Sequence, residues 1–138
     1  MRWEDRVPRS DTGLELDGDE LLVSLGFVPR TLPDGVPVQH RTIRRLYPDR
    51  VVDVPAVSGF PPLPAMTKVV LFDGWHWHNR THHQEVDSAL KDGLYVAAGY
   101  FVVHVGDWWF KNESNKERLK PLLVEALRSG RPVELLNI

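Results

Sequence analysis

Two apolar segments that flank a helical segment constrain the fold of this chain more than any other feature of its sequence. Residues 68–72 and 100–105 are short runs rich in β-branched and aromatic residues, a composition typical of strands. Between them lies a set of apolar residues at helical spacing, followed by Gly99: Val86, Leu90, Leu94 and Ala97. This order predicts a right-handed crossover that joins a parallel pair of strands.

The remaining elements extend this unit into a mixed sheet. Residues 50–54 read as another strand, and the proline-rich stretch 58–64 would connect it to residues 68–72 as an antiparallel hairpin with a long loop. A first helix is expected over residues 10–26, with its N-terminal cap at Ser10–Thr12. A last helix is expected after Ser114, which would be its N-terminal cap. The fold class predicted is α/β, with a mixed central sheet flanked by helices.

Length and composition bound the domain organisation and the compartment. The 138 residues suit one domain, which we expect over residues 10–138 after a polar arm at residues 1–9. Cysteine is absent, which fits a reducing compartment and excludes disulfides. No apolar leader or membrane span is evident, so we expect a cytoplasmic protein without a membrane partner.

The charge balance is informative only locally. The formal net charge of −2 counts mildly against a dedicated nucleic-acid binder, because such proteins are often basic. Four arginines nevertheless fall within ten residues, and they predict either a solvated face or a DNA-backbone contact: Arg41, Arg44, Arg45 and Arg50.

The densest polar cluster follows the strand at residues 68–72. It comprises Asp73, His76, His78, His82, His83, Glu85 and Asp87. Sites in open α/β sheets gather at the carboxyl ends of parallel strands, so the location favours function. A carboxylate beside a neutral imidazole suits metal-assisted hydrolysis, whereas the four histidines alone would also suit a transition-metal site, and a polar loop without chemistry is the third interpretation.

Asp49 joins this cluster by a geometric argument. Residue 61 is the midpoint between Asp49 and Asp73 and lies in the proline-rich loop, so a hairpin centred there would place these two carboxylates opposite each other. Facing carboxylates repel unless a cation lies between them. Trp75 and Trp77 flank His76, where they would stack on bases or pack into the core.

Three stretches resemble the very-short-patch-repair (Vsr) endonucleases and their Vsr-like relatives. Residues 9–26 resemble the N-terminal helix of that family, with its Asp-Thr, its glutamate and a terminal Leu-Gly. Residues 69–78 (Val-Val-Leu-Phe-Asp-Gly-Trp-His-Trp-His) resemble its strand that ends in Asp-Gly and Trp-His, and residues 97–105 resemble its next helix end and core strand. Together the stretches cover most of residues 9–128, with an insertion near 56–66.

The resemblance implies a restriction-endonuclease-like fold of the PD-(D/E)xK superfamily and Mg²⁺-dependent (or Mn²⁺-dependent) cleavage of double-stranded DNA. Asp49 and Asp73 would bind the metal, and His78 would activate the attacking water. Glu15 would support the site, and Asp87 would match an acid at the start of the next helix. For DNA contacts the implied residues are Trp75, Trp77, Arg41, Arg44 and Arg45.

The sequence departs from the family pattern at several positions. The cysteine-based zinc site is absent, no lysine occupies the third signature position, and Leu71 stands where relatives carry an acid before Asp-Gly. Two alternatives therefore stay open beside the endonuclease: a catalytically inactive binding or assembly protein with the same fold, and a histidine-rich metal-binding protein. Protein partners are not indicated by the sequence.

Overall fold

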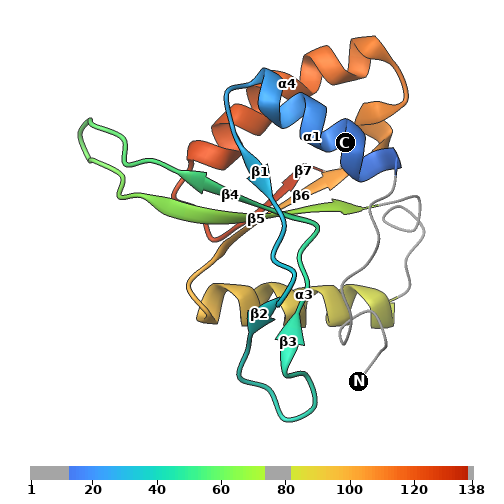
Figure 1. Ribbon diagram of the computed structural model, residues 1–138, viewed down its shortest axis with the longest axis vertical. Coiled ribbons are helices and arrows are strands. Elements are labelled where there is room, and N and C mark those ends of the chain that lie inside the picture. The colour runs from blue at the N-terminus through green and yellow to red at the C-terminus, as the bar shows by residue number, and fades with distance from the viewer. Residues whose placement is uncertain (1–12, 74–81, 137–138) are drawn as a thin grey trace.

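A computed structural model describes residues 13–73 and 82–136 (Figure 1). Its helices are α1 (Gly13–Ser24), α3 (His82–Ala97) and α4 (Glu113–Arg128), with a short 3-10 helix, η2, at Asp107–Phe110. The strands are β1 (Pro29–Arg30), β2 (Val36–Pro37), β3 (Arg45–Leu46), β4 (Arg50–Val54), β5 (Met66–Asp73), β6 (Phe101–Gly106) and β7 (Val133–Leu136). No helix within these ranges has the length and apolarity that crossing a membrane requires.

Five of the described strands form one mixed sheet in the order β1-β4-β5-β6-β7. The antiparallel hairpin of β4 and β5 and the parallel pair of β5 and β6 confirm the topology predicted from the sequence. Strand β7 pairs parallel to β6 and was not predicted, although it follows directly after Pro132 and carries three apolar residues in four. The α/β class with a mixed central sheet is therefore correct.

Helices cover both faces of the sheet and enclose two separate cores. Figure 1 shows α1 and α4 on one face, and α3 with the small β2–β3 hairpin on the other. Under α1 and α4, the buried core includes Leu22, Val70, Phe72, Val103 and Leu123. Under α3 and the hairpin, it includes Val36, Leu46, Val69, Tyr95 and Val102. Side chains alternate along β5, so Phe72 lies on the face covered by α1 and α4, and Asp73 lies on the face covered by α3.

Helix boundaries follow the predicted signals at some ends only. Gly26 and Gly99 follow α1 and α3 with φ values of 91° and 96°, a conformation that glycine adopts without strain. The predicted cap of α4 at Ser114 is wrong, because Asn112 caps this helix by accepting a hydrogen bond from the Asn115 amide. The other predicted cap, at Ser10–Thr12, lies outside the described residues.

Helix α3 forms where its apolar spacing predicted it, but of the four spaced apolar residues only Leu94 packs against the core. Val86 and Leu90 are 54% and 39% exposed, whereas Asp92 and Tyr95 are buried. The helix therefore turns a partly polar face toward the sheet. A polar partner on the sheet is needed to explain this orientation, since a buried carboxylate without one costs several kcal/mol.

The closest packing of α1 on the sheet depends on Gly18. A Cβ atom built on Gly18 would lie 2.2 Å from Cζ of Phe72. We predict that Gly18→Ala lowers the free energy of unfolding by about 1–3 kcal/mol, because the ring or the helix must shift. Urea unfolding followed by circular dichroism measures the change.

Gly93 in α3 is the matched control, because a Cβ atom there would meet nothing within 4 Å. Gly93→Ala should raise the free energy of unfolding by up to about 1 kcal/mol through helix propensity alone. Equal effects of the two substitutions would contradict the packing argument at Gly18.

Candidate functional site

Asp49 is held at the end of β5 by a backbone hydrogen bond. It directly precedes β4, is buried, and accepts a hydrogen bond through Oδ2 from the Phe72 amide at 2.8 Å. The carboxylate of Asp49 therefore lies beside the residue that precedes Asp73. The next residue, Arg50, turns to the other face and binds Asp19 of α1 through two nitrogens at 2.7 and 2.9 Å.

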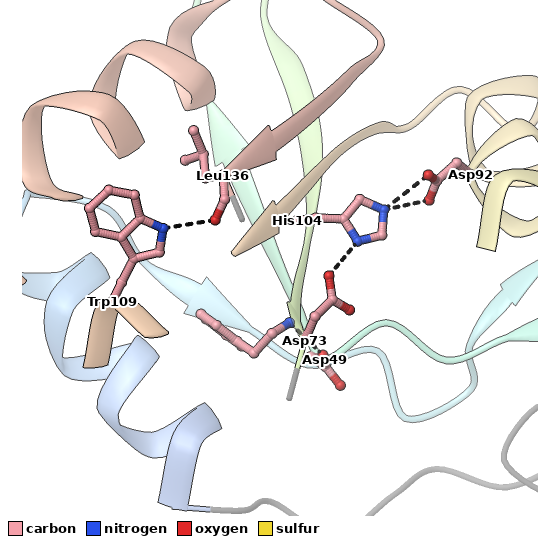
Figure 2. Close-up of polar contacts among 7 residues, drawn as sticks. Asp49, Asp73, Asp92, His104, Trp109 and Leu136 are labelled. Atoms are coloured by element: carbon pink, nitrogen blue, oxygen red, sulfur yellow. Dashed lines mark hydrogen bonds and ion pairs between the residues drawn. The ribbon is translucent and has the colours of Figure 1, made fainter. Parts of the chain in front are cut away.

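Asp73 belongs to a network of three side chains centred on His104. The Nδ1 atom of His104 lies 2.8 Å from Oδ2 of Asp73, and its Nε2 atom lies 2.8 Å from Oδ1 of Asp92. Figure 2 shows the imidazole ring between the two carboxylates. The network joins β5, β6 and α3, and it provides the polar partner on the sheet that the orientation of α3 requires.

His104 carries a positive charge in this environment. Burial by itself lowers the pKa of the imidazole, but the hydrogen bonds and the negative charges of Asp73 and Asp92 outweigh it and raise the pKa to about 9. The side chain of His104 is 3% exposed, and those of Asp73 and Asp92 are 16% and 12% exposed. Near neutral pH this is a charged imidazolium between two carboxylates.

The predicted facing of Asp49 and Asp73 across the hairpin is wrong by two residues. Arg50 pairs with Val70 in the ladder, which places Asp49 opposite Leu71 rather than Asp73. The hairpin is centred on residue 60, and the bridge between Val57 and Leu63 continues the same register into the loop. Asp49 still reaches the end of β5, because its side chain extends along the strand to the Phe72 amide.

Two other predicted acids lie on helices. Glu15 is buried in the first turn of α1, a helix that covers the opposite face of the sheet from Asp73. Asp87 is in the first half of α3 and lies 3.5 Å from Lys91, one helical turn further on. The two acids thus lie on opposite faces of the sheet, Glu15 on α1 and Asp87 on α3.

The predicted arginine cluster is divided by the fold. Arg41, Arg44 and Arg45 are exposed on the β2–β3 hairpin and its turn, and Arg45 donates to the Asp34 carbonyl. Arg50 is 4% exposed and pairs with Asp19, so its inclusion in a solvated basic face is wrong. The predicted residues Trp75, His76, Trp77 and His78 lie outside the described residues, as do the side chains of His82 and His83.

Sequence reasoning missed His104 and Asp92. The available signal was a histidine within the otherwise apolar run of residues 101–105, since a buried imidazole needs a hydrogen-bonding partner. The helical spacing of Asp92 relative to Tyr95 then places that acid on the same face of α3. The apolar spacing of α3 does not identify this face, because Val86 and Leu90 are exposed.

The described residues provide carboxylates suited to Mg²⁺ but no complete metal cage. Across 13–73 and 82–136, no group of three or more histidine, aspartate or glutamate side chains gathers to hold a metal ion. Mg²⁺ commonly takes one or two protein carboxylates and completes its shell with water and substrate phosphates. Asp49 and Asp73 each have one oxygen oriented by a nitrogen donor, which fits such a pair.

Comparison of the chain with protein-family models, curated proteins and solved structures found no match. The interpretation of the site therefore rests on its residues and their arrangement.

We predict a pH-dependent stability that reports the charge on His104. Its pKa is about 9 in the folded protein and near 6.5 in the unfolded chain, so its contribution is complete below pH 6.5 and is lost as pH rises through 9. Urea unfolding should show a loss of about 2 kcal/mol between pH 6.5 and pH 8.

Asp92→Asn is the diagnostic variant. It removes one of the two carboxylates that raise the pKa of His104, so the loss of stability over the same pH range should become smaller. A wild-type protein whose stability is constant from pH 6.5 to pH 8 would contradict the assignment of an imidazolium.

Proposed function

We propose that this protein is a metal-dependent endonuclease that hydrolyses phosphodiester bonds of double-stranded DNA, with a restriction-endonuclease-like fold. The observation that carries the proposal is the position of the buried carboxylate of Asp49, bonded to the Phe72 amide beside Asp73. Two acids thereby lie at the carboxyl end of β5, a strand in a parallel pair, which is where sites of α/β sheets form. The Trp-His-Trp-His segment follows in the sequence after Gly74.

The chemistry of these residues suits metal-assisted hydrolysis. Asp49 and Asp73 would hold Mg²⁺ or Mn²⁺, which when bound polarises phosphoryl oxygens and offsets developing negative charge. His78 would accept a proton from the attacking water, a task for which an imidazole is suited near neutral pH. His104 would keep the Asp73 carboxylate in one orientation through the contact at 2.8 Å.

The exposed arginines would supply binding to the DNA backbone. Arg41, Arg44 and Arg45 lie on the β2–β3 hairpin and its turn. This hairpin covers the face of the sheet on which the Asp73 side chain lies. Phosphate contacts of this kind position a protein on DNA without reading its sequence. Trp75 and Trp77, in the segment that follows β5, would stack against bases or enter the duplex.

A second candidate is a DNA-binding or assembly protein that has the fold without the activity. Leu71 is the observation in its favour, because it occupies the ladder position opposite Asp49, where an acid would complete a carboxylate pair. The bond between Asp73 and His104 also engages one oxygen of the remaining acid. A histidine-rich metal-binding protein is the third candidate, and the side chains that would form its site lie outside the described residues.

Cleavage of supercoiled plasmid tests the enzymatic proposal. We expect Mg²⁺- or Mn²⁺-dependent nicking or linearisation that EDTA abolishes and that falls by about 100-fold or more in Asp49→Asn. His78→Ala should lose cleavage and keep DNA binding, because a proton acceptor contributes about 100-fold or more to rate without holding the duplex.

Asp53→Asn is the matched control for Asp49→Asn. Asp53 is in β4, four residues after Asp49 and on the same face of the sheet, but it is exposed and pairs with Arg30 at 2.9 Å. Its replacement should leave cleavage unchanged. Folded wild-type protein that binds DNA and does not cleave it with either metal would establish the binding candidate instead.

Salt dependence tests the arginine contacts independently of catalysis. A plot of log K against log salt concentration has a negative slope. Each phosphate contact that is removed should reduce the magnitude of this slope by about 0.9. Arg41→Ala, Arg44→Ala and Arg45→Ala should each show this change in fluorescence-anisotropy titrations with duplex DNA. Arg118→Ala, on α4 at the other face, serves as the control and should leave the slope unchanged.

A further inference from the structure

A pocket of about 630 Å³ lies at the end of β4 that is remote from Asp49. Its walls come from the segment after α1, the end of β4, the start of the 55–65 loop and the end of α4, and they include Phe27, Val54, Pro55, Ala56 and Val57. This volume is within the range of about 300–1,000 Å³ that small-molecule sites occupy. The walls are mostly apolar, so an occupant must present an apolar body.

Two of the three charged residues of the pocket neutralise each other. Arg30 binds Asp53 through Nε at 2.9 Å and through its second nitrogen at 3.1 Å. This pair lines the pocket without adding net charge.

Arg128 is the remaining charge and sits at the last position of α4. Its guanidinium lies over the Phe27 ring, 5.9 Å from the centroid. Within residues 13–73 and 82–136, no carboxylate lies within ion-pair distance of it. The pocket therefore combines an apolar interior with one positive charge that is available to an anion.

The pocket is separate from the candidate active site. Asp49 and Val54 lie at opposite ends of β4, about 17 Å apart at the rise of an antiparallel strand. Figure 1 shows the end of β4 and the end of α4 on one side of the molecule, and the end of β5 on the other. A ligand in the pocket would not compete for Asp49 or Asp73.

We propose that this pocket binds a small amphipathic carboxylate, with its hydrocarbon or aryl body against Phe27, Val54 and Ala56 and its carboxylate on the Arg128 guanidinium. A guanidinium matches a carboxylate by two parallel hydrogen bonds, which favours a carboxylate over a neutral head group. The aliphatic or aromatic body buries apolar area that the pocket leaves open to water. The proposal is independent of nuclease activity.

Titration with decanoate, followed by isothermal calorimetry on the full chain, tests this site. We expect saturable one-to-one binding that is about tenfold or more weaker in Arg128→Met, because the charge is lost while the apolar stem remains. Arg118→Met is the matched control, since Arg118 is on the same helix and also lies over an aromatic ring, at 5.7 Å from Trp108, but outside the pocket. Its affinity should equal that of the wild type.

Further measurements test the contributions of the pocket volume, the ligand charge and the active site to decanoate binding. Ala56→Trp should fill the pocket and abolish binding, decanol should bind more weakly than decanoate, and Asp49→Asn should bind decanoate normally. Absence of saturable binding to the wild type would overturn the proposal. So would equal affinity of Arg128→Met and the wild type, or undiminished binding to folded Ala56→Trp.

Discussion

The His104 imidazolium between two carboxylates is the interaction on which the α3 side of the molecule depends. A charge buried between a sheet and a helix is tolerated only when partners offset its desolvation, and His104 has Asp73 at one ring nitrogen and Asp92 at the other. This requirement fixes the rotation of α3 about its axis, because Asp92 must face β6. Val86 and Leu90 then point to solvent as a consequence of helical periodicity.

A second buried cation has a corresponding role on the opposite face. Lys68 is fully buried in β5, donates from Nζ to the Ser129 carbonyl at 2.8 Å, and lies 5.0 Å from the Phe101 ring centroid. Burial lowers the pKa of this lysine to about 8. Its ammonium satisfies a carbonyl at the C-terminus of α4, where the helix dipole favours positive charge. Buried cations on both faces thus link the sheet to helices: His104 to α3, and Lys68 and Arg50 to α4 and α1.

The sequence predicted the elements that apolar patterns define, but not the contacts that buried charges and a long loop determine. Apolar runs and helical spacing correctly indicated α1, β4, β5, α3, β6 and α4, because each of these elements carries apolar residues at strand or helical spacing. The buried face of α3 was not predictable from apolar spacing, since a charge pair determines it. The register of β4 on β5 depends on a loop centred on residue 60, and an error of one residue in that centre moved Asp49 by two positions.

The same network bears on how the candidate active site would work. The positive charge of His104 offsets part of the negative charge of Asp73, so Asp73 attracts a divalent cation less strongly than an unpaired carboxylate would. Asp49 accepts a backbone hydrogen bond from the Phe72 amide, which orients its carboxylate at the end of β5. Leu71, opposite Asp49, adds no charge. In the proposed endonuclease, Asp49 would be the ligand anchored to the backbone of β5, and Asp73 would be the acid that couples the site to β6 and α3.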